Sequence, residues 1–198
     1  MQLPLFPLRT VLFPGGLLPL KVFEQRYVEM TKTCARDGRP FGVCLITRGE
    51  EVASPAAPAP QFATVGTLAT ISAWDSPQLG ILQVASTGGE RFEVRSHAVR
   101  TDGLAVAEVS PIPAEPAVAL LPAHAPLVRF LELVASRVGP RHFPATHAWE
   151  DATWVGYRLA ELLPLPLSVK QGMLEINDAQ LRLAMLRKFL AGEGLLEA

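Results

Sequence analysis

The hydrophobic pattern of the chain changes its period at a proline-rich segment, residues 111–116. Before this segment, short runs of β-branched or alternating apolar residues recur between turn signals, which is typical of strands. After it, apolar residues recur every three or four positions, which is typical of helices. The pattern predicts an α+β protein, with a strand-rich domain over residues 1–112 and a helical domain over residues 113–198.

Within the first half, the alternating runs predict strands over residues 41–47, 63–72, 79–86, 91–96 and 104–109. One helix is expected among them, over about residues 23–37, because Phe23, Tyr27 and Met30 share a helical face and Gly38 suits a helix end. Prolines remove amide donors from residues 55–60, so this stretch is expected to be an exposed, mobile loop.

The second half predicts a small bundle of helices. Pro126 fits the first turn of a helix that Gly139 and Pro140 would end. A second helix is expected to start near residues 146–147 and to end at residues 163–164.

Capping signals refine these helix starts. Glu150 and Asp151 would lie in the first turn of the second helix, where the helix dipole favours anions. Two further helices are expected to begin at capping boxes headed by Ser168 and Asn177.

Composition and charge exclude several classes of protein. The 198 residues are 49% hydrophobic and 19% charged, which suits a globular chain with a sizeable core. A net charge of −1 disfavours nucleic acid and anionic lipid as partners. No apolar run approaches the roughly 20 residues that span a bilayer, and prolines interrupt the N-terminus before a signal peptide could form. We expect a cytoplasmic protein with no membrane partner.

A search for catalytic motifs is negative. No glycine is followed directly by lysine, so the chain has no P-loop for a nucleotide. Ser168 and Lys170 stand two positions apart on an expected helix and would point in different directions. Residues 86–89 lie between two expected strands and suit a tight turn better than a nucleophile elbow. We therefore expect neither enzyme activity nor a bound cofactor.

Metal-ligating residue types occur without the spacing of a metal site. His142, His147, Glu150 and Asp151 lack the H-E-x-x-H pattern, so a polar loop between helices explains them better than zinc ligation. Cys34 and Cys44 form no C-x-x-C pair and are expected to be reduced and buried. No metal ion is expected.

Several segments carry a resemblance to a known family. Residues 3–27 begin L-P-L-F-P-L, continue with V-L-F-P-G and end with F-E-x-R-Y, and residues 88–94 contain a G-x-x-R-F run. Residues 41–45, 65–71, 159–165 and 170–175, with Arg182 after them, follow the same family order. Together they resemble the N-terminal substrate-binding domain of Lon proteases in its stand-alone form, which is related to the Lon-like domain of cereblon.

This resemblance implies a PUA-like β-barrel followed by a C-terminal helical bundle. It also implies a non-catalytic module that recognises unfolded or degron-bearing polypeptide, without the ATPase and protease modules of full Lon enzymes. Delivery of a substrate would then require a separate ATP-dependent protease. Apolar surface at the junction of barrel and bundle is the expected place for binding.

The matched motifs supply six candidate partner-binding residues: Phe13, Pro14, Arg26, Tyr27, Arg91 and Phe92. Each of them also has a purely structural interpretation, because glycine, proline and aromatic positions commonly serve fold geometry. Three other functions stay open. The chain could be a small-molecule or RNA-binding PUA-like protein, an assembly or scaffold adaptor for a separate protease, or a cryptic hydrolase with a nucleophile and base in one pocket.

Overall fold

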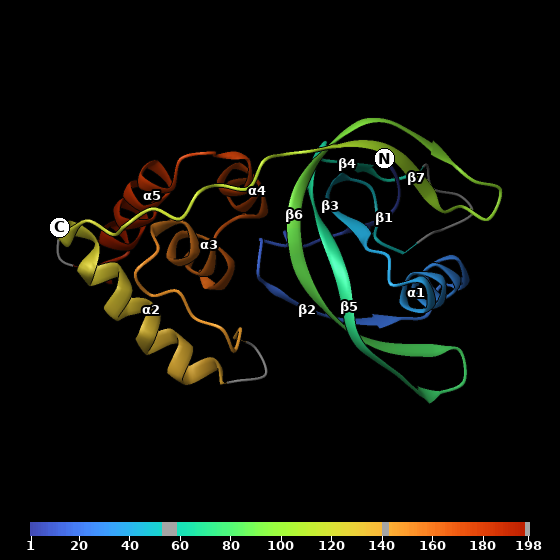
Figure 1. Ribbon diagram of the computed structural model, residues 1–198, viewed down its shortest axis with the longest axis horizontal. Helices are drawn as coiled ribbons and strands as arrows, with labels where there is room; N and C mark the ends of the chain where they lie inside the picture. The colour runs from blue at the N-terminus through green and yellow to red at the C-terminus, as the bar shows by residue number, and fades with distance from the viewer. Residues whose placement is uncertain (53–58, 140–142, 197–198) are drawn as a thin grey trace. The chain divides into compact units, whose positions relative to one another are not determined.

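The computed structural model describes residues 1–52, 59–139 and 143–196. The chain divides into two compact units, Met1–Pro113 and Ala114–Ala198. The first contains the strands and the second contains helices, so the expected α+β class is confirmed (Figure 1). The expected domain boundary between residues 112 and 113 stays a prediction. Most of the expected loop at residues 55–60 lies outside the described residues.

The described part of the first unit contains β1 (Gln2–Leu8), β2 (Leu17–Val22), α1 (Gln25–Asp37), β3 (Phe41–Arg48), β4 (Gln61–Phe62), β5 (Val65–Gln78), β6 (Ile81–Val99) and β7 (Ala105–Pro111). The strand order is β1-β7-β6-β5-β3-β4, and β2 pairs with β6 beside this path. Because β1 also pairs in parallel with β3, the strands close into a ring. One parallel pairing and two strands outside the ring distinguish it from a regular barrel.

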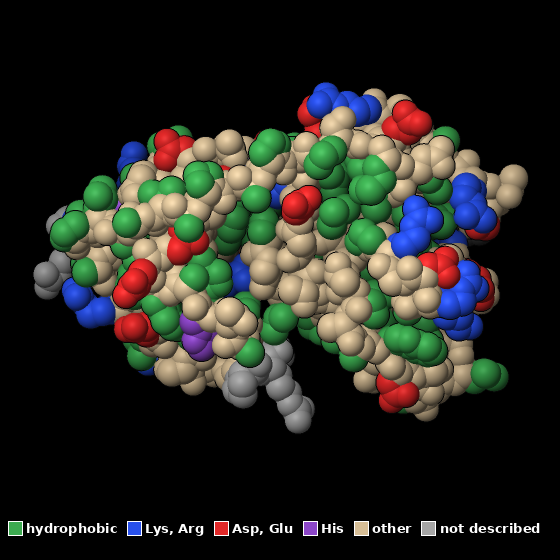
Figure 2. Space-filling view, in the orientation of Figure 1, with side chains coloured by type: hydrophobic (Ala, Val, Ile, Leu, Met, Phe, Trp, Pro, Cys, Tyr) green, Lys and Arg blue, Asp and Glu red, His purple; other side chains and the backbone are tan. Residues whose placement is uncertain are grey.

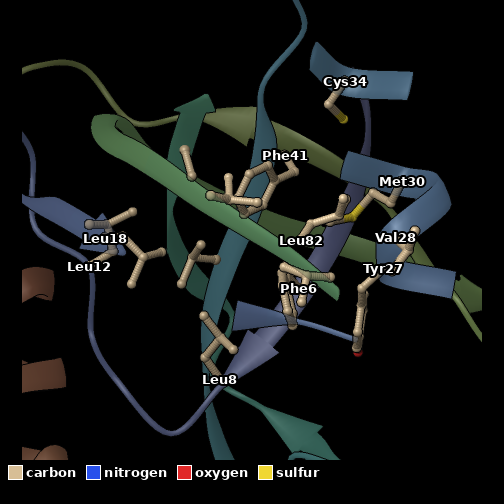
Figure 3. Close-up of a cluster of buried hydrophobic side chains, with 14 of the residues drawn as sticks. Phe6, Leu8, Leu12, Leu18, Tyr27, Val28, Met30, Cys34, Phe41 and Leu82 are labelled. Atoms are coloured by element: carbon tan, nitrogen blue, oxygen red, sulfur yellow. The ribbon is translucent and has the colours of Figure 1, made fainter. Parts of the chain in front are cut away.

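The larger apolar cluster of the first unit fills the space between the strands and α1 (Figure 3). Tyr27, Val28 and Met30 lie on the buried face of α1. The Tyr27 ring stacks on Phe6 of β1, with 4.0 Å between the ring centroids. Gly38 ends the helix with a φ of 61°, a conformation that glycine adopts without strain.

The V-L-F-P-G segment folds as a chain reversal that packs against the middle of β6. The Gly15 amide donates to the Gly88 carbonyl and the Gly88 amide donates to the Gly16 carbonyl, both at 2.8 Å. A Cβ atom on Gly88 would lie 2.2 Å from the carbonyl oxygen of Phe13. The tight turn expected at residues 86–89 is wrong, because β6 continues through them and glycine there admits another segment of backbone.

The described part of the second unit contains a 3-10 turn, η1 (Pro122–His124), and the helices α2 (Ala125–Val138), α3 (Ala152–Leu162), α4 (Leu167–Glu175) and α5 (Ala179–Gly192). Pro126 lies in the first turn of α2 and Gly139 ends that helix, as expected. Pro140, the other expected stop signal, lies outside the described residues.

Three expected helix starts are wrong in detail. Helix α3 begins at Ala152, because the Asp151 carboxylate accepts from the Thr153 amide at 3.0 Å and so caps the helix from outside its first turn. Helix α4 begins before Ser168, with Pro166 at its N-cap, so the proposed capping box does not form. Helix α5 is capped by Asp178, one residue after Asn177.

Two arginines lie at the centre of the second unit. Arg182 of α5 donates to both carboxylate oxygens of Glu115, at 3.1 and 2.5 Å, and lies over the Tyr157 ring at 4.1 Å. The Tyr157 hydroxyl donates to the same carboxylate. The side chains of Arg182 and Glu115 are 0% and 3% exposed, so the charges of this pair are almost completely removed from water.

The second arginine forms a smaller group of charges. The Arg158 Nε atom lies 3.1 Å from the Glu161 carboxylate, and Lys170 donates to the Glu161 carbonyl at 2.6 Å. Burial raises the pKa of Glu161 above its ordinary value, although the charges of Arg158 and Lys170 act in the opposite direction. Burial also lowers the pKa of Lys170.

Candidate functional site

Three strands of the first unit form an arm, which consists of β2, residues 71–78 of β5 and residues 81–86 of β6. The β5–β6 hairpin of this arm extends away from the rest of the ring (Figure 1). Strand β3 pairs with β5 only as far as Ala69. Within the described residues, the edge of β5 beyond that point therefore has no neighbouring strand. An unpaired edge leaves main-chain donors and acceptors available to another extended segment.

The cross-strand register places apolar side chains in a row across this arm. Leu20 of β2 is opposite Val84 of β6, and Val84 is opposite Trp74 of β5. The neighbouring row consists of Lys21, Gln83 and Asp75. That row projects from the opposite face of the strands and carries one cation and one anion, so it adds no net charge to the arm.

A shallow depression of about 560 Å³ lies over these rows. We call its lining the arm patch, which consists of Pro19, Leu20, Lys21, Ala73, Trp74, Asp75, Gln83, Val84 and Ala85. Trp74 is 49% exposed, although a tryptophan is among the side chains that gain most from burial. Exposed apolar surface rimmed by polar residues is typical of an interaction site.

The hairpin tip continues this apolar surface. The pair Gln78 and Ile81 leaves Leu79 and Gly80 as the two turn residues, and Gly80 has a φ of 79°. Leu79 is fully exposed, and Figure 2 shows hydrophobic side chains over the end of the hairpin. Phe23, directly after β2, is 53% exposed. Large apolar side chains are thus exposed on β5, on the hairpin turn and on the residue that follows β2.

The six residues expected to contact a partner lie elsewhere in the first unit. Phe13, Tyr27, Arg91 and Phe92 are all buried. Phe92 belongs to the smaller apolar cluster of this unit. Burial of this kind favours their structural interpretation, while partner binding by these residues stays a prediction.

Arg26 and Pro14 are partly exposed. Arg26 donates to the Glu24 carboxylate at 2.9 Å and to the Gly103 carbonyl at 2.8 Å, so it joins the start of α1 to the turn between β6 and β7. Its guanidinium also lies 4.5 Å from the centre of the Tyr27 ring. Burial raises the pKa of Tyr27 to about 12, although the charge of Arg26 opposes that rise.

Comparison with known families gives a match over almost the whole chain. The model of the ATP-dependent protease La (LON) substrate-binding domain matches residues 2–192. The chain belongs to the Lon substrate-binding domain family. The resemblance expected from the opening motifs is therefore confirmed.

Solved structures of this family share the fold. A Lon N-terminal domain protein from Xanthomonas campestris is 35% identical, with a TM-score of 0.75, and the match covers 95% of this chain and 98% of that one. The N-terminal domain of a Lon protease from the Mycobacterium avium complex is 16% identical, with a TM-score of 0.61 and coverage of 96% and 98%. The second likeness shows the fold alone.

Curated relatives of the Lon substrate-binding family are much longer than the matched region. The Lon protease of Anaeromyxobacter dehalogenans (strain 2CP-C) is 43% identical over 70 residues, which are 35% of this chain and 8% of that protein. Protein cereblon of Gallus gallus is 27% identical over 153 residues, which are 75% of this chain and 31% of that protein. The chain spans less than a third of either relative.

The arm patch was not identified from the sequence. Strands were expected to end at residue 72 and to resume at residue 79, so Trp74 fell in an unassigned polar stretch. The available signal was a tryptophan among polar residues, followed by Leu79 and Gly80 between two apolar runs. Leu-Gly is a weak hairpin signal beside Asn-Gly or Asp-Gly.

The histidines and cysteines of the described residues lie outside the arm patch. In residues 1–52, 59–139 and 143–196, no three His, Cys, Asp or Glu side chains come together as metal ligands. His142 lies outside these ranges, so the expected absence of a metal stays a prediction. Cys34 and Cys44 are free and buried, and burial raises the pKa of the Cys44 thiol to about 12. No helix among the described residues is long and apolar enough to cross a membrane.

Proposed function

We propose that the chain binds unfolded or degron-bearing polypeptide through the arm patch and does not cleave it. One observation carries this proposal: a half-exposed tryptophan beside an unpaired strand edge, over an open apolar depression. Membership in a family described as a substrate-binding domain supports the same class of ligand.

The patch suits an extended chain of varied sequence. An unfolded segment offers apolar side chains to the exposed part of Trp74, and main-chain groups to the free edge of β5. Main-chain contacts of this kind do not depend on the sequence of the client. Covering the exposed half of Trp74 would contribute about 2–3 kcal/mol before the entropy of ordering the client is subtracted. Binding through this patch alone should therefore be weak.

The electrostatic character of the patch favours polypeptide over RNA. Lys21 and Asp75 cancel within the lining, and the whole chain has a net charge of −1. RNA binding would require a basic stripe along the strands. The second role that we propose is that of a cytoplasmic adaptor, in which a separate ATP-dependent protease would unfold and cleave what this chain binds. Membership in the substrate-binding domain family supports the binding part of this role.

A binding measurement with a permanently unfolded model protein tests the proposal. We expect Trp74→Ala to weaken binding about tenfold, in line with the loss of about 1–2 kcal/mol of apolar contact. Trp74→Phe should restore most of the affinity. Val99→Ala is the matched control, because Val99 is 53% exposed on β6 but lies outside the arm patch.

Salt dependence separates the apolar mode from an electrostatic one. The affinity should change little between low and moderate salt, because ions screen charges and do not weaken apolar burial. A steep loss of affinity with salt would contradict the apolar mode. Equal binding by wild type and Trp74→Ala would contradict the arm patch, and tighter binding of single-stranded RNA than of unfolded protein would contradict the proposed ligand class.

A further inference from the structure

The first unit contains a second concave site, which shares no lining residue with the arm patch. It is a pocket of about 280 Å³ between α1, the start of β1 and the turn that joins β6 to β7. Its apolar wall includes Leu3, Met30, Leu104 and Val106. The volume is at the low end of ligand pockets, which are about 300–1,000 Å³, so a ligand enclosed here would be small.

The polar wall of this pocket contains three cations and two anions. The cations are Arg26, Arg39 and Arg100, and the anions are Glu29 and Asp102. Arg100 pairs with Asp102 at 3.0 Å. A pocket attracts a charged ligand only where its own charges do not already cancel.

Most of these charges have partners on the protein. Arg26 pairs with Glu24 at 2.9 Å, and Glu29 lies 3.8 Å from Lys32. The pocket and these partners together contain four cations and three anions, so their net charge is +1. The cations are Arg26, Arg39, Arg100 and Lys32, and the anions are Glu24, Glu29 and Asp102. The surplus belongs to Arg39.

Arg39 is free to bind a ligand. Its guanidinium makes no hydrogen bond or ion pair to any described residue, and the nearby Asp37 carboxylate is occupied by Arg36 at 2.8 Å.

We propose that this pocket binds a carboxylate attached to an apolar group, such as the apolar C-terminal residue of a polypeptide or a small aliphatic acid. The carboxylate meets Arg39, and the apolar group lies against Met30 and Leu104. A single negative charge neutralises the one surplus cation. A phosphate, with about two negative charges, would exceed it beside Glu29 and Asp102.

The inference rests on the pocket and not on the arm patch. A C-terminal residue bound here would add a second, end-specific contact to a client held at the patch, but small ligands test the pocket independently. N-acetyl-leucine and N-acetyl-leucinamide have the same apolar side chain and differ in the charge of the carboxyl group. Titration of each into the ¹⁵N-labelled full chain, followed by NMR, measures both affinities.

We expect N-acetyl-leucine to shift the amide signals of Thr33 and Leu104 and to bind at least tenfold more tightly than the amide. Arg39→Gln should reduce the affinity for the acid to that for the amide. Arg48→Gln is the matched control, because it removes the same charge from an exposed position of β3 outside the pocket. Equal affinities for acid and amide, no binding of either, or no effect of Arg39→Gln would overturn the proposal.

A blocking variant and two further ligands complete the test. Thr33→Trp should fill the pocket from α1 and abolish acid binding, while Gln25→Trp, at an exposed and uncharged position of the same helix outside the lining, should not. A peptide acid ending in leucine that binds far better than isovalerate would identify a polypeptide end as the source, and equal binding would identify a small acid. Trp74→Ala should leave all of these affinities unchanged, so failure of the arm patch and failure of this pocket are distinguishable.

Discussion

The interiors of both units are mainly apolar, but they differ in the charges that they enclose. In the first unit, the strands and α1 enclose two clusters of apolar side chains. In the second unit, Arg158 and Arg182 are the largest completely buried side chains, and each lies beside a glutamate. Apolar burial tolerates small errors of geometry, whereas a buried ion pair is stabilising only while both partners remain in place.

This difference predicts where each unit is most sensitive to substitution. The first unit should respond to steric changes at the places where backbones approach each other closely. The second should respond to changes in charge that leave one partner of a buried pair alone. Three substitutions test this contrast in order of decreasing expected effect.

The largest effect is expected from Arg182→Met. It removes the partner of Glu115, whose carboxylate is almost completely buried, and it also removes donors to the Met173 and Ile176 carbonyls. We expect the free energy of unfolding of the second unit to fall by about 3–5 kcal/mol. Urea unfolding followed by circular dichroism of the helices measures the loss.

Two controls distinguish charge from packing in this experiment. Lys188→Met, at an exposed position of the same helix, should change the free energy of unfolding by less than about 0.5 kcal/mol. The double variant Glu115→Leu, Arg182→Met should lose less than the sum of its single variants. Strict additivity of the two losses would show that the pair is not coupled and would remove the contrast between the units.

A smaller effect is expected from Gly88→Ala in the first unit. The added Cβ would lie 2.2 Å from the Phe13 carbonyl oxygen, so one of the two backbones must move. A loss of about 1–3 kcal/mol is expected, which is the range for added atoms in a well-packed interior. Gly89→Ala is the adjacent control, because its nearest atoms would lie at 3.6 Å. A similar loss for both variants in thermal unfolding would argue against the close contact as the cause.

The smallest effect is expected from pH, through Glu161. Because burial raises its pKa in the folded state, the folded chain retains a proton that the unfolded chain releases above its ordinary pKa of 4.5. The stabilisation is complete below pH 4.5 and is lost as pH rises through the raised pKa. The difference in the free energy of unfolding between wild type and Glu161→Gln, measured by urea at pH 4.5 and pH 7, should therefore depend on pH. A constant difference would contradict the raised pKa.

Local signals in the sequence predicted most elements of the fold. The apolar face formed by Tyr27 and Met30 predicted α1, and Gly38 predicted where that helix ends. Pro126 and Gly139 predicted the start and the end of α2. These features act within one helix, where residues a few positions apart determine the geometry. The opening motif of residues 3–27 supplied the family, which the match over residues 2–192 confirms.

Long-range contacts account for what was predicted incorrectly or missed. A Gly-Gly pair suits a tight turn when viewed alone, and only the approach of Phe13 from a distant part of the chain shows why Gly88 lies inside a strand. Asp151 caps α3, and its carboxylate also accepts from the Val118 amide at 2.9 Å. This contact joins residues 33 positions apart, so the local sequence around Asp151 does not reveal it. The arm patch depends on the register of three strands, and no periodicity within one strand reveals it.

The pairing of β1 determines when the first unit can be completed during synthesis. Leu3 of this strand is opposite Ala107 of β7, while its later residues, Leu5 to Leu8, pair with β3. The ribosome therefore releases the first strand long before it has made the last strand that completes the ring. Until about residue 111 has emerged, one side of β1 lacks its neighbour, and the nascent chain carries an open edge that can pair with other chains. Ring closure by the first and last strands thus makes this unit slow to complete, and until then it exposes the growing chain to strand-to-strand association at β1 that the finished ring prevents there.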